Sequence, residues 1–165
     1  MATVEERAGV GLDLEPLESL HARLVRDFPL ASALGIQIMA AGVNGVRLEA
    51  PFAPNRNGHG SFFGGSSIAL ALISGWLLVR NWVDAAGIDA DVVIQEVNAR
   101  FEAPVAERVR VCAFPPAPRV WKRFHQMLDR YGRARVEIEM EVSSASEAHA
   151  TRLLGRYVAL ASSGG

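Results

Sequence analysis

The chain has 165 residues, of which 50% are hydrophobic and 21% are charged, and its formal net charge is −1. A chain of this length and composition is expected to form one domain with its own core, and it lacks the basic excess with which proteins bind nucleic acids or anionic membranes. Its single cysteine, Cys112, excludes an intrachain disulfide and favours a reducing compartment, so we expect a cytoplasmic protein.

The first part of the chain is expected to form a helix followed by a β-hairpin. Leucine and valine recur at helical spacing between residues 15 and 27, and residues 29–34 should add a short helical turn. Apolar and polar residues then alternate in two runs that predict strands, over 36–40 and 46–52. The dipeptide Asn44-Gly45 between the runs is a strong hairpin-turn signal.

A polar, glycine-rich loop over 54–61 leads into an uncharged apolar stretch. No charged residue occurs from 57 to 79, and about 20 apolar residues are enough to cross a membrane. Ser66, Ser74 and Gly75 interrupt the stretch and amphipathic strands flank it, so we expect no membrane span. The stretch instead predicts a helix over 65–86 that is buried on nearly all sides.

The second half of the chain is dominated by strands. Their residues alternate between apolar and polar, or extend as long β-rich runs, over 91–102, 108–114, 134–142 and 151–160. Between the second and third of these, the spacing of apolar residues over 120–131 indicates a short amphipathic helix or an ordered lid.

Several strands with one segregated long helix are typical of the α+β class, here as a curved antiparallel sheet wrapped around the long apolar helix. We therefore expect an N-terminal helical extension, one globular domain and a flexible tail, over residues 1–28, 29–161 and 162–165.

One motif and three shorter matches carry a family resemblance. They are Asn55-x-Asn57-x-x-Gly60-Ser61-x-Phe63-x-Gly65-Ser66 with Ser74-Gly75-Trp76, then Val92-Val93-Ile94 with Phe101-x-x-Pro104, and Gly155-Arg156-Tyr157-Val158. Over about residues 29–160, this pattern resembles the thioesterases of the YiiD C-terminal-domain family. The resemblance implies a hot-dog fold that assembles as a dimer or a dimer of dimers. It also implies hydrolysis of acyl-CoA or acyl-carrier-protein thioesters, with coenzyme A or phosphopantetheine present only as part of the substrate and with neither a further cofactor nor a metal.

The start of the long helix is the candidate oxyanion site. A glycine-rich turn that enters a helix offers free backbone N–H groups and the positive end of the helix dipole. Gly64, Gly65 and Ser66 lie at this point, where they could hold the oxyanion that forms when water attacks a thioester. Alternatively, the two glycines only permit a tight turn and close helix–sheet packing.

Four side chains are candidates for activating the water. Asn57 could bind both the water and the carbonyl, or it could stabilise its own loop. His59 could be the general base, or it could be a solvent-exposed loop residue. The central helix carries no acid between 65 and 82, so a catalytic carboxylate would have to be Glu96 or Glu102 on the following strand; a solvated strand face is the alternative.

The substrate slot is expected to use residues around this point. The predicted binding residues are Ser61, Phe63, Gly64, Trp76 and Asn98, although the aromatic residues could equally be core. Arg119, Lys122 and Arg123 either meet phosphates of coenzyme A or form a solvated helix face.

Two other functions remain open. The acid-free helix also fits a non-catalytic protein that binds acyl thioesters. A hydratase or dehydratase of enoyl or hydroxyacyl thioesters would need an Asp and a His a few residues apart, whereas the loop offers Asn57 and His59.

Overall fold

The computed structural model describes residues 16–162. In chain order the elements are α2 (Leu17–Asp27), α3 (Pro29–Leu34), β1 (Gln37–Gly42), β2 (Gly45–Ala50), the short 3-10 helix η1 (Ala53–Asn55), α4 (Gly64–Ala85), β3 (Ala90–Phe101), β4 (Val109–Phe114), α5 (Pro118–Tyr131), β5 (Arg133–Ser143) and β6 (Thr151–Ala161). Residues 120–131, which the sequence left as a helix or a lid, thus lie in a regular helix. The predictions for residues 1–15 and 163–165 lie outside the described residues.

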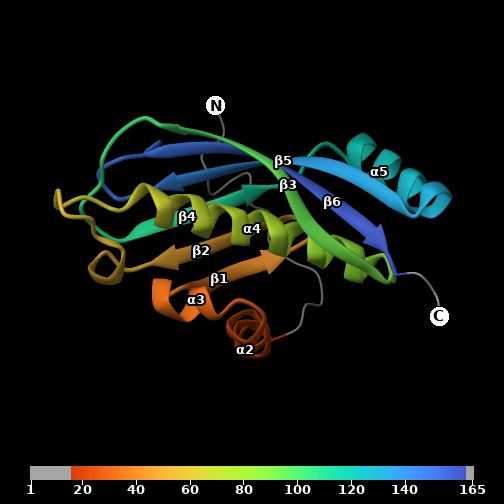
Figure 1. Ribbon diagram of the computed structural model, residues 1–165, viewed down its shortest axis with the longest axis horizontal. Coiled ribbons are helices and arrows are strands. Elements are labelled where there is room, and N and C mark those ends of the chain that lie inside the picture. Colours follow the sequence, from red (N-terminus) through yellow and green to blue (C-terminus); the bar gives the residue numbers. More distant parts are fainter. Residues whose placement is uncertain (1–15, 163–165) are drawn as a thin grey trace.

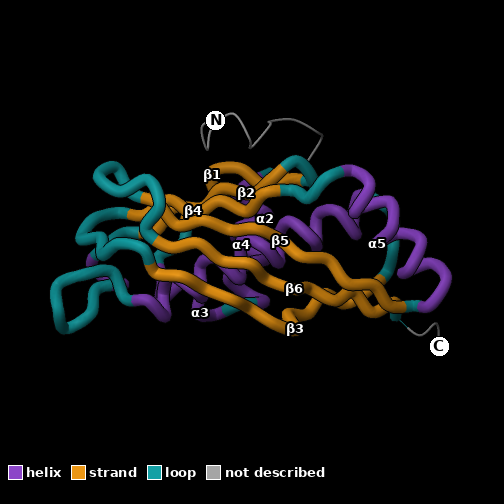
Figure 2. The backbone as a smooth tube through the Cα atoms, turned by 90° about the horizontal axis from the view of Figure 1, so that it is seen from above, coloured by secondary structure: helices purple, strands orange, loops and turns teal. Residues whose placement is uncertain are grey.

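The strands form one six-stranded antiparallel sheet in the order β1-β2-β4-β5-β6-β3. The sheet curves around α4, which runs along its inner face, while α2 and α3 lie beside β1 (Figures 1 and 2). Leu20 and Leu24 of α2 are buried in the same core as the sheet, so α2 packs as part of this body. β1 and β3 are the two edge strands.

The helix α4 is long because its 22 residues include no proline and end only at Ala86–Gly87, where Gly87 has a φ of +68°. It is the one helix among residues 16–162 that is long and apolar enough to cross a membrane, and 67% of its most apolar stretch is buried. The inner face of the sheet accounts for this burial, since α4 contacts all six strands. The predicted buried helix is therefore the core helix of the domain.

Tyr157 and Gly75 show how closely α4 approaches the sheet. The fully buried Tyr157 hydroxyl donates a hydrogen bond to the Leu72 carbonyl of α4 at 2.8 Å, and burial raises the pKa of this phenol well above its ordinary value. A Cβ atom on Gly75 would lie 2.7 Å from Met140 Sδ and 2.7 Å from Tyr157 Cζ. Only glycine at this position lets the helix pack so tightly on β5 and β6.

The helix α5 packs beside the part of β5 that has no strand partner on one side. β4 pairs with β5 only from Glu139 to Ser143, so β5 residues 133–138 have no strand partner on that side. α5 packs there instead and covers the C-terminal half of α4, where Trp121 stacks on Trp82 with ring centroids 4.8 Å apart. This arrangement places α5 at the opposite end of α4 from Gly64 (Figure 1).

Candidate functional site

Free backbone donors gather at the start of α4. The N-cap residue Phe63 supplies no side-chain cap, and the first helical hydrogen bond runs from the Ser67 amide to the Phe63 carbonyl at 3.1 Å. Within the described residues, the preceding amides of Gly64, Gly65 and Ser66 have no backbone or side-chain acceptor. Three N–H groups at the positive end of a 22-residue helix are suited to hold a negatively charged oxygen.

Two exposed phenylalanine rings lie so close to Gly64 and Gly65 that a side chain at either position would meet them. A Cβ atom on Gly64 would lie 3.0 Å from Phe101 Cε1, and one on Gly65 would lie 2.7 Å from Phe63 Cζ. Both rings are 54% exposed. Close approach of the two rings therefore requires glycine, and the rings flank the amides with apolar surface that a substrate could contact.

The side chain of Asn57 organises the loop before α4. Its Oδ1 accepts hydrogen bonds from the amides of His59 (2.9 Å) and Ser61 (3.1 Å), and its Nδ2 donates to Ser61 Oγ (2.9 Å). The loop-stabilising interpretation of Asn57 is thus visible in the structure, and the second N–H of its amide remains available. A catalytic role for Asn57 stays a prediction.

His59 lies at the exposed tip of the same loop. Its backbone amide is bound by Asn57, but within residues 16–162 nothing hydrogen-bonds its ring. The imidazole is therefore accessible to solvent. A role of His59 as the general base stays a prediction.

Asn55 is an anchor that the sequence analysis did not assign. It is only 1% exposed, and its Nδ2 donates to the carbonyls of Leu34 (2.9 Å) and Pro51 (2.8 Å). Its own carbonyl accepts from the Phe63 amide at 2.7 Å. Asn55 thereby ties the end of α3 and the exit of β2 to the residue that begins α4. The only sequence feature that pointed to a role for Asn55 was its position in the family motif, two residues before Asn57.

Glu96 and Asn98 lie on the outer face of the sheet. The register pairs Glu96 with Arg156 and Asn98 with Leu154, whereas Phe101 and the inner-face residues point to the other side. Glu96 forms an ion pair with Arg156 at 2.6 Å, and Arg156 also binds Glu137 at 2.8 Å. The hydrogen bond that Arg156 donates to Glu137, together with the charge of Glu96, raises the pKa of Arg156. Within one chain, the structure therefore does not bring Glu96 or Asn98 to the start of α4.

Trp76 is also distant from the amides. It lies 12 residues along α4 from Gly64, about 18 Å at helical rise. Its Nε1 donates to the Val92 carbonyl at 2.9 Å, and its ring packs edge-on against Phe28 at 4.8 Å. These contacts attach β3 and the α2–α3 corner to α4.

The inner face of the edge strand β3 carries exposed apolar residues. Ile94, Val97 and Phe101 are 42%, 37% and 54% exposed. Val97 and Phe101 were not among the site residues expected from the sequence. An unpaired strand edge with exposed apolar side chains is a common association surface.

The described residues contain no group of three or more His, Cys, Asp or Glu side chains arranged to hold a metal ion. The candidate site therefore consists of backbone amides, aromatic rings and the Asn57 loop.

Comparison with known proteins gives one family and several related structures. The sequence model of the family described as "Putative thioesterase (yiiD_Cterm)" matches residues 17–161. A protein of unknown function from Chlorobaculum tepidum superposes with a TM-score of 0.81 at 24% identity, covering 88% of this chain and 94% of its own. A protein from Shewanella oneidensis described as a "putative thioesterase" gives 0.76 at 24% identity, with 87% and 96% covered.

A third solved structure, from Pseudomonas aeruginosa and described as "Probable Thioesterase", superposes with a TM-score of 0.79 at 22% identity. It covers 92% of this chain and all of its own. At these identities the likeness establishes the fold. No curated protein matches the chain significantly.

Proposed function

Because the chain belongs to the YiiD C-terminal thioesterase family, we propose that it hydrolyses acyl thioesters and holds the thioester carbonyl at the start of α4. The antiparallel sheet wrapped around α4 confirms the predicted α+β hot-dog fold, which the related structures share. The observation that carries the proposal is the set of open amides at Gly64, Gly65 and Ser66.

The proposed reaction is direct attack by water. The water oxygen bonds to the acyl carbon, and the carbonyl oxygen becomes an oxyanion that accepts hydrogen bonds from the Gly65 and Ser66 amides. The carbon–sulfur bond then breaks, and the thiolate takes up a proton. The products are a carboxylic acid and the free thiol of coenzyme A or of a carrier-bound phosphopantetheine.

We assign the remaining roles to the loop before α4. Asn57 orients the water through its free amide N–H, and His59 takes the proton of the water. Glu96 is less suitable, because its carboxylate is on the outer face and is already paired with Arg156. Joining a second sheet edge-to-edge at β3 would leave Glu96 on that outer face.

We further propose that the functional unit contains two copies joined at β3. This strand is 12 residues long, has one free edge and exposes Ile94, Val97 and Phe101. Antiparallel pairing with the same strand of a second copy would satisfy the edge and cover these residues. Phe101 contacts the start of α4, so the partner would come close to the amides.

The assembly is testable by sedimentation. Val97→Lys should convert the dimer into a monomer, because it places a charge on the apolar inner face of the edge strand. Asn98→Lys, one residue along and on the outer face, is the matched control and should remain dimeric. A dimer that survives Val97→Lys would show that β3 is not the interface.

The test of the reaction is release of free thiol from acyl-CoA thioesters, from acetyl to palmitoyl with aryl examples, and from acyl carrier protein. Cys112 is 1% exposed, and a Cys112→Ala variant removes any background from this thiol. Hydrolysis of any substrate class supports the proposal. His59→Ala should lower kcat, because the variant lacks the side chain that takes the proton of the water; an unchanged kcat would remove His59 from the proposed mechanism.

A binding protein is the second candidate. The absence of any acid from Gly64 to Val83 of α4 and the unbound imidazole of His59 both fit a protein that binds a thioester without cleaving it. Equilibrium binding of an acyl-CoA without turnover of any substrate would favour this function.

A further inference from the structure

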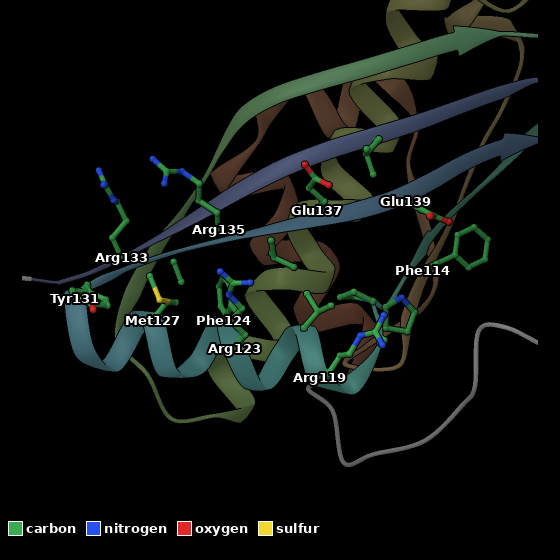
Figure 3. Close-up of a pocket in the computed structure, with 17 residues that line it drawn as sticks. Phe114, Arg119, Arg123, Phe124, Met127, Tyr131, Arg133, Arg135, Glu137 and Glu139 are labelled. Atoms are coloured by element: carbon green, nitrogen blue, oxygen red, sulfur yellow. The ribbon is translucent and has the colours of Figure 1, made fainter.

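A broad groove separates α5 from the outer face of β5 and β6 (Figure 3). Its volume is about 1240 Å³. The groove lies at the α5 end of the domain, away from Gly64, and no step of the proposed reaction uses it. On the strand side it is bounded largely by the part of β5 that extends beyond the pairing with β4.

The helix α5 has two apolar faces. Trp121, Phe124 and Leu128 are buried, and Trp121 and Phe124 pack on Trp82 of α4. A second set, one step around the helix, lines the groove and includes Val120 and Met127. Val120 is partly buried against the core, whereas Met127 is exposed in the groove.

The lining of the groove combines an apolar floor with basic walls. Met127, Tyr131 and Leu154 are 39%, 59% and 41% exposed there. Arg119 and Arg123 stand on the α5 wall, and Arg133 and Arg135 stand on the β5 wall (Figure 3).

The charges of the groove are only partly balanced. No described acid forms an ion pair with Arg119, Arg123 or Arg133. Of the two lining acids, Glu137 shares Arg156 with Glu96, and Glu139 lies near Phe114. The groove therefore presents apolar surface between a positively charged α5 wall and a β5 wall that carries Arg133 and Arg135 at one end and two glutamates at the other.

We propose that this groove docks an acidic, amphipathic helix of the carrier protein that delivers the thioester, an inference that rests on the proposed function. An apolar stripe would lie on Met127 and Leu154, and acidic residues beside the stripe would meet the arginines of α5 on one side and those at the start of β5 on the other. A small ligand fits less well, because ligand pockets enclose most of their occupant whereas this lining is largely exposed. An added strand fits less well too, because α5 packs directly beside the free edge of β5.

In the proposed dimer, the groove of one copy would lie toward the start of α4 in the other copy. Arg133 pairs with Leu160 and Ala90 pairs with Ala161, so the groove lies at the Ala90 end of β3. Antiparallel pairing of two β3 strands would place this end beside the Phe101 end of the partner strand. The groove of one copy would then lie at the same end of the joined sheet as the start of α4 in the other.

The test uses charge reversal on one wall of the groove. The single variants Arg119→Glu and Arg123→Glu are compared with Lys122→Glu, which makes the same charge change on the same helix but outside the groove lining, and the double variant Arg119→Glu/Arg123→Glu reverses both charges of the wall. The probes are a labelled synthetic helix with a leucine stripe flanked by glutamates, the same helix with lysines in place of glutamates, an acyl carrier protein thioester and an acyl-CoA. Arg133→Glu on the opposite wall is a second variant, in case the double variant is unstable.

We expect the groove variants to weaken binding of the acidic helix about tenfold or more and to raise KM for the carrier thioester similarly. Turnover of acyl-CoA should be unchanged, and Lys122→Glu should match the wild type. The lysine helix should bind weakly to all forms.

Three results would overturn the proposal. One is equal binding of the acidic helix by the wild type and all the groove variants. Another is a rise in KM for acyl-CoA with none for the carrier thioester, which would make the groove a site for coenzyme A phosphates. The third is a change of oligomeric state in the groove variants, which would make it an interface between copies. Failure of the proposed function appears separately, as absence of hydrolysis in the wild type whatever the helix binding shows.

Discussion

Gly65→Ala should lower kcat for thioester hydrolysis about a hundredfold, the usual cost of disturbing one oxyanion donor. The added methyl would lie 2.7 Å from Phe63 Cζ, so the ring must move. Phe63 is 54% exposed and can rotate without disrupting the core, but the methyl and the displaced ring would occupy space next to the amides. The loss should therefore appear in kcat and not in the free energy of unfolding.

The measurement is single-turnover hydrolysis of the best substrate by the wild type and by Gly65→Ala, together with urea unfolding of both. Gly58→Ala is the matched control, because a Cβ there has nothing within 4 Å. A double variant with Phe63→Ala should recover part of the rate if the ring causes the loss. Full activity in Gly65→Ala would mean that the start of α4 does not hold the carbonyl.

Gly75→Ala should destabilise the protein by about 2 to 3 kcal/mol. The methyl would lie 2.7 Å from both Met140 Sδ and Tyr157 Cζ, and these two side chains are 2% and 0% exposed. Tyr157 cannot move aside without losing its hydrogen bond to the Leu72 carbonyl, which is worth about 1 kcal/mol. The gain in helix propensity from alanine, also about 1 kcal/mol, offsets only part of this cost.

Urea midpoints of Gly75→Ala, Tyr157→Phe and the double variant test this account. The double variant should be less destabilised than the sum of the two single variants, because removal of the hydroxyl relieves part of the clash. Strict additivity, or a Gly75→Ala protein as stable as the wild type, would show that α4 has space to shift away from the sheet.

The two glycine substitutions on α4 are expected to change different quantities, kcat in one case and the free energy of unfolding in the other. Gly65 faces the exposed ring of Phe63, whereas Gly75 faces the buried, hydrogen-bonded ring of Tyr157. The same substitution is therefore expected to affect turnover at one end of α4 and folding near its middle.

The local pattern of the chain was sufficient to locate most elements. The uncharged run before Val79 predicted the core helix, and strict alternation predicted β5, whose residues from Ala134 to Val142 are buried at every second position. The motif that carries the family resemblance also placed Gly64, Gly65 and Ser66 at the start of the helix. These features depend on residues near one another in the chain, so periodicity and turn chemistry reveal them.

Only the tertiary structure decided which faces and elements meet. The sequence offered Glu96 as a candidate carboxylate, but pairing with Arg156, 60 residues away, places Glu96 on the outer face. The buried bonds of Asn55 to Leu34 and Pro51, the ring of Phe101 over Gly64, and the groove beside α5 likewise join parts of the chain that have no common local signal. One strand or helix face can be buried equally well against several others, so the local pattern does not specify its partner. Hydrogen bonding and side-chain packing in the assembled sheet determine which partners meet.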